Sequence, residues 1–295
     1  MDIEYLKKLN VKFNIIDEKE AANLISSEYP LNRLIEFASI FEQYKMTDKQ
    51  GQFVNLEFAQ LYYLTKIDER LRHILMKMCL EIEQKIKYIL ISDSIKLKVA
   101  RTFLTEYIRS DYDYLYRHYS KELDLFISGD ENVYTLDKFL DIITFGTFVK
   151  LVRAFYQQYA QEIYHKKHAS FEQYLSSVHH IRNKAAHNVT LLSELNEKRG
   201  LLNPQVSEYL AKHGINSKTL KTNLSRTIVF DITSVMHLYC NLLSREQIKQ
   251  NNKVWRKFVF KECRSYKKLF QKNEILKSAY RFSQKVVRIY SKKVT

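Results

Sequence analysis

Apolar residues recur every three or four positions along most of the chain, and the longest such run covers residues 55 to 92. Its stripe comprises Phe58, Leu61, Thr65, Asp68, Leu71, Leu75, Met78, Ile82, Ile86 and Ile89. This spacing places the residues on one face of an α-helix. Only five glycines and two prolines interrupt the 295 residues, so few turns separate one helical segment from the next. The pattern predicts an all-α fold with one very long helix.

Further helices are predicted on both sides of this run. Pro30 opens one over residues 31 to 45, and Thr144 begins another whose buried face holds Leu151, Val152, Phe155 and Tyr159. Ser170 is the expected N-cap of a helix whose buried face is formed by Phe171, Tyr174, Leu175, Val178, Ile181 and Ala185. The last helix before the C-terminal segment is expected over about residues 221 to 243.

One acidic residue, Asp68, lies inside the apolar stripe of the long helix, and Arg72 follows it by one turn. We interpret the two as a partly buried ion pair that fixes how this helix docks. The alternative is a position close to a functional site.

The positive charge of the chain is concentrated at its C-terminal end. The net charge is +15. Residues 245 to 295 contain 16 lysines and arginines and three acids, a net charge of +13, whereas the preceding residues carry 32 bases and 30 acids. We therefore divide the chain into a body, residues 1–243, and a basic tail, residues 244–295, and expect the body to fold without the tail.

The tail is predicted to form two amphipathic helices. One apolar stripe contains Trp255, Phe258, Val259, Glu262, Tyr266 and Leu269, and the other contains Leu276, Tyr280, Ser283, Val287 and Tyr290. Such helices bind either nucleic acid or an anionic membrane surface. We favour RNA over a membrane, because the stripes are interrupted and can be used in packing on the body. The candidate RNA-binding residues are Arg256, Lys257, Lys261, Arg264, Lys267, Lys268, Arg281 and Arg288.

The cysteines give no sign of a disulfide framework or a metal site. Cys79, Cys240 and Cys263 are odd in number, widely spaced and embedded in helical segments. The first 20 residues mix acids and bases and do not resemble a signal peptide. We expect a cytoplasmic protein without a metal or other cofactor.

The segment His179 to Asn188 contains the candidate catalytic residues Arg182, Asn183 and His187, in the order Arg-Asn-x-x-x-His. Histidine can act as acid or base near neutral pH, arginine binds phosphate and asparagine can orient either group. These side chains suit RNA cleavage without a metal. One set is half of what the reaction needs, and a symmetric dimer would supply two histidines and two arginines. We interpret His179 and His180 as bystanders, although His179 can share a helix face with Asn183.

The motif inside an apolar helix resembles the signature of the HEPN superfamily of helical ribonucleases. Together with Asp68, Leu71 and Arg72, and with the Phe-Gly-Thr element at residues 145 to 147, it resembles the Abi-like (abortive infection) branch of that superfamily over about residues 20 to 240. The resemblance implies a HEPN-like helical bundle with additional helices, and a metal-independent, toxic ribonuclease of antiviral defence. It assigns catalysis to Arg182 and His187, with Asn183 as polar neighbour. Some members of the family are encoded with a small noncoding RNA.

Two functional hypotheses follow. The first is a homodimeric HEPN endoribonuclease of abortive infection that binds RNA through its tail. Its product would carry a 2′,3′-cyclic phosphate. In one variant of this hypothesis the protein forms a complex with a small noncoding RNA. The alternative is an RNA-binding regulatory module with a catalytically inert HEPN core.

Overall fold

The chain is all-α, as predicted. The computed structural model describes residues 2–45, 48–127, 135–163, 169–198 and 204–292. Within these ranges there is no β-strand, and only three isolated bridges pair extended residues. No helix in the described ranges is long and apolar enough to cross a membrane.

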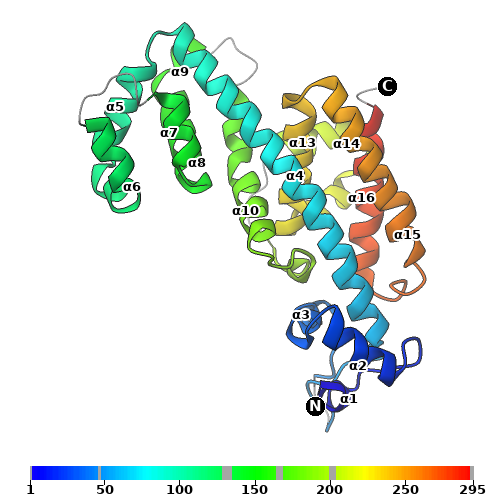
Figure 1. The fold of residues 1–295 in the computed structure, drawn as a ribbon. Coiled ribbons are helices and arrows are strands. Elements are labelled where there is room, and N and C mark those ends of the chain that lie inside the picture. Colours follow the sequence, from blue (N-terminus) through cyan, green and yellow to red (C-terminus); the bar gives the residue numbers. More distant parts are fainter. Residues whose placement is uncertain (1, 46–47, 128–134, 164–168, 199–203, 293–295) are drawn as a thin grey trace.

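The long helix α4 (Phe58–Lys96) is the element around which the others are arranged. It runs diagonally through the molecule in Figure 1 and contacts helices of every other region. A capping box between Glu57 and Gln60 starts it. At 39 residues it is about 58 Å long, from a rise of roughly 1.5 Å per residue.

A small group of helices packs at the beginning of α4. It comprises α1 (Asp2–Lys8), α2 (Glu18–Ser27), α3 (Leu31–Ile35) and a 3₁₀ turn (Ala38–Ile40). The helix predicted over residues 31 to 45 is wrong in length, since α3 ends at Ile35. The chain continues there into the 3₁₀ turn, which buries both Phe37 and Ile40.

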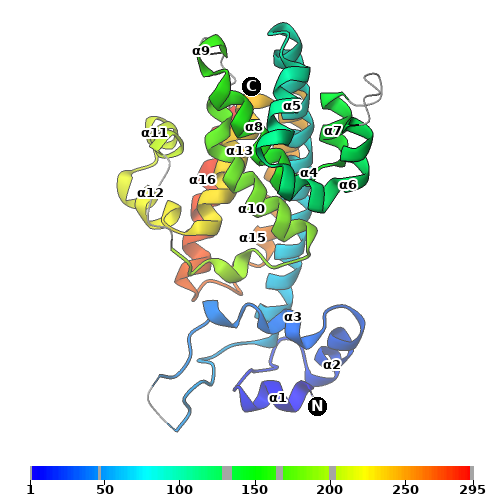
Figure 2. The same cartoon turned by 90° about the vertical axis from the view of Figure 1, so that its left-hand side faces the viewer.

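A second group lies toward the other end of α4. It contains α5 (Ala100–Ser110), α6 (Tyr112–Ile127), α7 (Leu136–Ile142), α8 (Phe145–Gln158) and α9 (Ala160–Ile163). Thr144 is the N-cap of α8, as predicted, and accepts a hydrogen bond from the Thr147 amide. Figure 2 shows α8 and α10 close together in front of α13.

The motif lies on α10 (Leu175–Ala186), which packs against α4, α8 and α13 (Thr227–Leu242). A 3₁₀ turn, Ala169–Tyr174, precedes α10. The helix therefore starts five residues after Ser170, the predicted N-cap. A second 3₁₀ turn, η3 (Leu192–Glu194), follows the motif, and α11 (Pro204–Lys212) and α12 (Ser217–Leu224) lead to α13.

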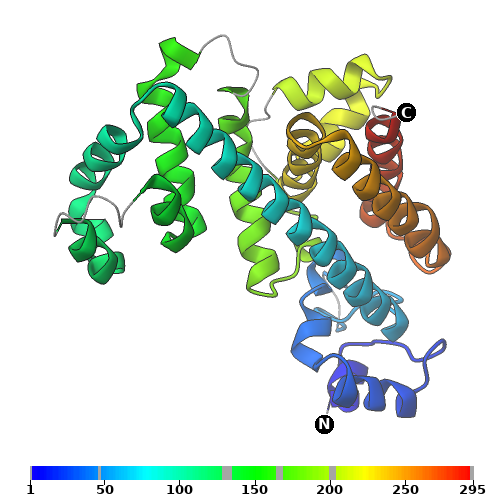
Figure 3. The same ribbon diagram turned by 45° about the horizontal axis from the view of Figure 1, so that its top comes forward.

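The basic tail forms helices that pack on the body. It comprises α14 (Arg245–Lys257), a π-helical turn (Phe258–Glu262), α15 (Cys263–Ser265) and α16 (Glu274–Lys292). In Figure 3 the orange α14 lies beside the red α16, and α16 also packs against α13. Trp255 Nε1 donates to Met78 Sδ at 3.2 Å, and a 3.0 Å hydrogen bond joins Tyr290 to His237.

The apolar side of the tail is continuous with the core of the body. Its buried apolar residues are Ile248, Trp255, Phe258, Val259, Phe270, Phe282, Val286, Val287 and Tyr290. The boundary at residue 243 stays a prediction based on charge. The packing, however, leads us to expect that the body depends on the tail for its stability, contrary to the expectation from charge alone.

Candidate functional site

The motif stands at the C-terminal end of α10, and His187 is the residue that ends the helix. Its amide donates to the Asn183 carbonyl at 2.9 Å, while its side chain is exposed. Asn188 has a left-handed backbone (φ 56°), and the next amide, that of Val189, donates to the Lys184 carbonyl at 2.8 Å. This is the Schellman arrangement, for which asparagine is a common substitute for glycine.

Asp68 and Arg72 of α4 hold the segment that follows the motif. Asp68 Oδ1 accepts hydrogen bonds from the Leu191 and Leu192 amides at 2.8 and 2.7 Å. Its other oxygen accepts from Arg72 Nε at 2.9 Å, and a second nitrogen of Arg72 donates to the Asn188 side chain. Both ionic side chains are buried. The predicted ion pair is confirmed, and it anchors the end of the motif to α4.

Replacing Asp68 by alanine should cost about 3–5 kcal/mol of unfolding free energy, because Arg72 would remain as a buried charge without its counter-ion. Two backbone amides would also lose their acceptor. Urea denaturation measures the loss. Asp141→Ala is the matched control, since Asp141 is 81% exposed and 3.9 Å from Lys87, and its loss should cost less than about 0.5 kcal/mol. Equal destabilisation by the two variants would contradict the anchoring role of Asp68.

Arg182 and Asn183 face the start of α8. The Arg182 guanidinium lies over the Phe145 ring, 5.4 Å from its centre. Asn183 Nδ2 donates to His179 Nε2 at 2.8 Å, so His179 shares the Asn183 face. A Cβ on Gly146 would lie 3.5 Å from the same His179 nitrogen. The Phe-Gly-Thr element therefore packs directly on the motif helix.

Burial lowers the pKa of His179, and the charges of Arg182 and Arg153 and its neighbour His180 lower it further. The neutral ring is the form whose Nε2 can accept the Asn183 hydrogen bond.

The stability of the protein should fall as the pH drops below the unfolded-state pKa of histidine, about 6.5. There the unfolded chain binds a proton at His179 that the folded chain, with its lowered pKa, does not bind. His179→Gln removes this titration and should make the decrease between pH 7.5 and pH 5.5 smaller. The midpoints of urea denaturation at the two pH values measure this decrease in stability. An unchanged difference in the variant would show that His179 titrates alike in both states.

His180 belongs to a partly buried polar cluster that the sequence interpretation missed. Its Nδ1 lies 2.6 Å from Asp231 Oδ2, and Ser177 Oγ donates to the other oxygen of Asp231 at 2.6 Å. Asp231 is 2% exposed on α13. A carboxylate bound to Nδ1 fixes the ring orientation and leaves Nε2 for proton transfer. An acid within the apolar pattern of α13 is the signal that could have revealed the cluster, as Asp68 did in α4.

Within one chain the motif side chains are only partly brought together. Arg182 and Asn183 contact α8 and His179, whereas His187 is exposed at the helix end, and no hydrogen bond links Arg182 to His187 among the described residues. No group of three potential metal ligands occurs in the described ranges.

All eight predicted RNA-binding residues of the tail are exposed. Arg256 of α14 and Arg288 of α16 both lie over the Phe260 ring, 5.8 and 5.2 Å from its centre. The two tail helices thus place cations around an aromatic side chain at one position. Aromatic and cationic groups together suit single-stranded nucleic acid.

Comparison with known proteins identifies one family. The family model of the Abi-like protein matches residues 27–193, which include Asp68, Arg72, residues 145 to 147 and the motif. No curated protein and no solved structure matches the chain. The tail lies outside the matched residues. Because the match covers more than half of the chain, the protein belongs to the Abi-like family, which supports a role in abortive infection.

Proposed function

We propose that the protein is a metal-independent endoribonuclease of the HEPN type that acts in abortive infection as a homodimer. The observation that carries the proposal is the position of the motif: His187 is exposed where α10 ends, and Asp68 and Arg72 hold that end in place. A catalytic side chain has to be held in a fixed position, and buried contacts beside it provide this. The buried ion pair next to the exposed His187 is therefore an arrangement expected of a catalytic site.

The surroundings of His187 support a site shared by two chains. Ala186 and Val189 beside it are exposed, and Val189 is 41% exposed although apolar. A second α10 can therefore approach closely. A symmetric contact would bring two copies of His187 and two of Arg182 to one cleft.

Such a cleft supplies the groups that RNA cleavage needs. One His187 takes the proton of the 2′-OH, and the 2′-oxygen attacks phosphorus. The P–O5′ bond breaks, and the second His187, in its protonated form, donates a proton to the leaving oxygen. Arg182 neutralises the charge that develops on the phosphoryl oxygens. The products are a 2′,3′-cyclic phosphate and a 5′-OH.

The exposed cations of the tail would hold the RNA. The logarithm of the RNA association constant falls linearly with the logarithm of the salt concentration, by roughly 0.7 for each neutralised phosphate of a single strand. Neutralising four of these cations should therefore make this slope shallower by about 3. The variant carries Gln at Arg256, Lys257, Lys261 and Arg264. The matched control carries Gln at four exposed body lysines: Lys8, Lys19, Lys121 and Lys138. Equal loss of affinity for oligo(U) in both variants would contradict specific binding by the tail.

The test of the proposed function is incubation of the purified protein with single-stranded RNA in EDTA. We expect fragments ending in a 2′,3′-cyclic phosphate, and none from the Arg182→Ala/His187→Ala variant. Cleavage that needs Mg²⁺, or that survives in the variant, would contradict the proposal. Tight RNA binding without cleavage by the wild type would favour the inert regulatory module instead. Sequencing the RNA that copurifies with the protein tests for a small noncoding partner, which a single discrete species would support.

A further inference from the structure

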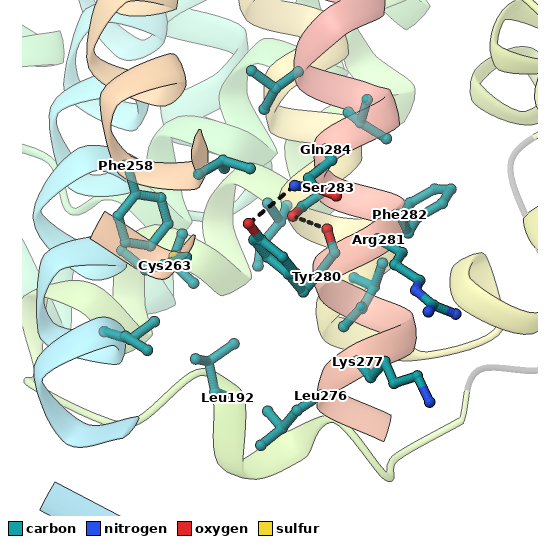
Figure 4. A pocket seen from close by; sticks show the side chains of 18 of the residues that line it. Leu192, Phe258, Cys263, Leu276, Lys277, Tyr280, Arg281, Phe282, Ser283 and Gln284 are labelled. Carbon is teal, nitrogen blue, oxygen red and sulfur yellow. Dashed lines mark hydrogen bonds between the residues drawn. The ribbon is translucent and has the colours of Figure 1, made fainter. Parts of the chain in front are cut away.

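A cavity of about 790 Å³ lies between α4, α13 and the tail, away from the motif (Figure 4). None of the three motif residues lines it. Its size falls within the range of small-molecule sites, roughly 300–1,000 Å³.

Aliphatic side chains are the largest group in the walls of the cavity, beside aromatic rings such as Phe258 and Phe282. The aliphatic group includes Leu64 and Leu71 of α4, Val229 and Met236 of α13, and Val259 and Val287 of the tail. Aliphatic walls stabilise an alkyl chain by about 0.8 kcal/mol for each CH₂ group removed from water.

Three polar side chains in the walls already bind protein atoms. Thr233 Oγ1 donates to the Val229 carbonyl at 2.6 Å, and Ser283 Oγ donates to the Tyr280 carbonyl at 2.8 Å. Gln284 Nε2 donates to the Tyr280 hydroxyl at 3.0 Å. These three side chains offer few free partners to the donors and acceptors of a nucleobase, whose burial without partners is costly. This favours an alkyl chain over a base in this part of the cavity.

The Tyr280 hydroxyl can donate to a ligand. Figure 4 shows its ring extending from α16 toward Cys263 and Phe258, while Lys277 and Arg281 point away from it. The hydroxyl oxygen accepts the hydrogen bond from Gln284, so its proton is free to bind an anion. Burial raises the pKa of Tyr280, which keeps this proton in place at neutral pH.

Cations surround the same end of the cavity. Arg264, Lys267 and Arg288 line it and are exposed. Arg288 lies over the Phe260 ring, 5.2 Å from its centre, and Arg264 follows Phe260 by one helical turn. Both charges lower the pKa of the Tyr280 hydroxyl. No carboxylate of the described residues lies within 4 Å of these three cations. This end is suited to an anionic head group.

We propose that the cavity binds a single-chain amphipathic anion of the fatty-acid type. Its alkyl chain lies against the aliphatic walls, and its carboxylate binds Arg264, Arg288 and the Tyr280 hydroxyl. The inference does not depend on the proposed ribonuclease activity.

Calorimetric titration of the full-length protein tests this site, with dodecanoate below its critical micelle concentration as the probe and bound nucleic acid removed in high salt. We expect one saturable site. Arg264→Gln/Arg288→Gln should weaken dodecanoate at least about tenfold, as expected for lost charged hydrogen bonds, and should leave the neutral dodecanol unaffected. Lys268→Gln/Lys285→Gln is the matched control, because both lysines are exposed in the same segments and do not line the cavity.

A second variant tests the cavity itself. Ala279→Trp places a large ring at a lining position and should abolish binding of both probes. If this variant does not fold, the Arg264→Gln/Arg288→Gln variant still tests the proposal. The proposal would be overturned if the wild type shows no saturable binding. It would also be overturned if the Arg264→Gln/Arg288→Gln and control variants lower the affinity for dodecanoate equally. Displacement of dodecanoate by AMP at a similar concentration would overturn it as well.

Discussion

Replacing His187 or Arg182 by alanine should lower the rate of RNA cleavage by about 10²–10⁴-fold, the usual contribution of a positioned acid or base. His187 is exposed and Arg182 is only partly buried, so folding should be little affected. Binding of oligo(U) through the tail should be unchanged. Single-turnover cleavage of a labelled oligonucleotide gives the rate, and thermal unfolding checks the fold.

His213→Ala and Arg109→Ala are the matched controls, because both residues are exposed and lie outside the motif. A mixture of wild-type chains with excess Arg182→Ala/His187→Ala chains tests the shared site. If one cleft needs His187 of both chains, a mixed dimer has a single histidine and should be inactive, so the excess variant should suppress the wild-type rate. Full activity of either single variant would remove the motif from the mechanism, and an unchanged wild-type rate in demonstrated mixed dimers would argue against a composite site.

Truncation after Leu243 should unfold the body. Each of the nine buried apolar residues of the tail stabilises the fold by about 1.5–3 kcal/mol through burial. Their sum, roughly 14–27 kcal/mol and an upper estimate because unfolded chains already bury some surface, exceeds or matches the 5–15 kcal/mol stability of a typical protein. Circular dichroism and limited proteolysis of residues 1–243 measure the outcome.

The variant with four neutralised tail cations is the control for this truncation. It keeps the apolar residues and should remain folded while it loses RNA affinity. A truncated chain that unfolds as cooperatively as the full-length protein, at a similar temperature, would show that the body is independent.

The periodic pattern was enough to predict α4 and the second tail helix, whereas the stripe of the first predicted tail helix runs past Ser265, where the helical segment ends. Their stripes are long, and local spacing decides which face is buried. The ion pair of Asp68 and Arg72 was also predictable, since a charged residue in an apolar stripe needs a partner, and a residue one turn away on the same helix is the nearest candidate.

Other features depend on contacts between distant segments. The pairing of His180 with Asp231 joins residues 51 positions apart, and spacing along α10 does not reveal it. The end of α10 at His187 follows from the left-handed Asn188, which Arg72 holds from α4. The high net charge of the tail favours a solvent-exposed segment, although the tail also contains apolar residues. Only the packed structure shows that these apolar residues complete the core of the body.

The core shared by body and tail links the proposed RNA cleavage at the motif to the proposed RNA binding by the tail. Helix α13 packs against α10 on one side and against α16 on the other, so the motif and the basic surface are fixed to the same rigid support. RNA held along the tail would reach His187 at a constant offset. The enzyme would then act as a ruler, whose cut lies a set number of nucleotides from the bound segment and whose choice of bond depends on distance rather than on base sequence.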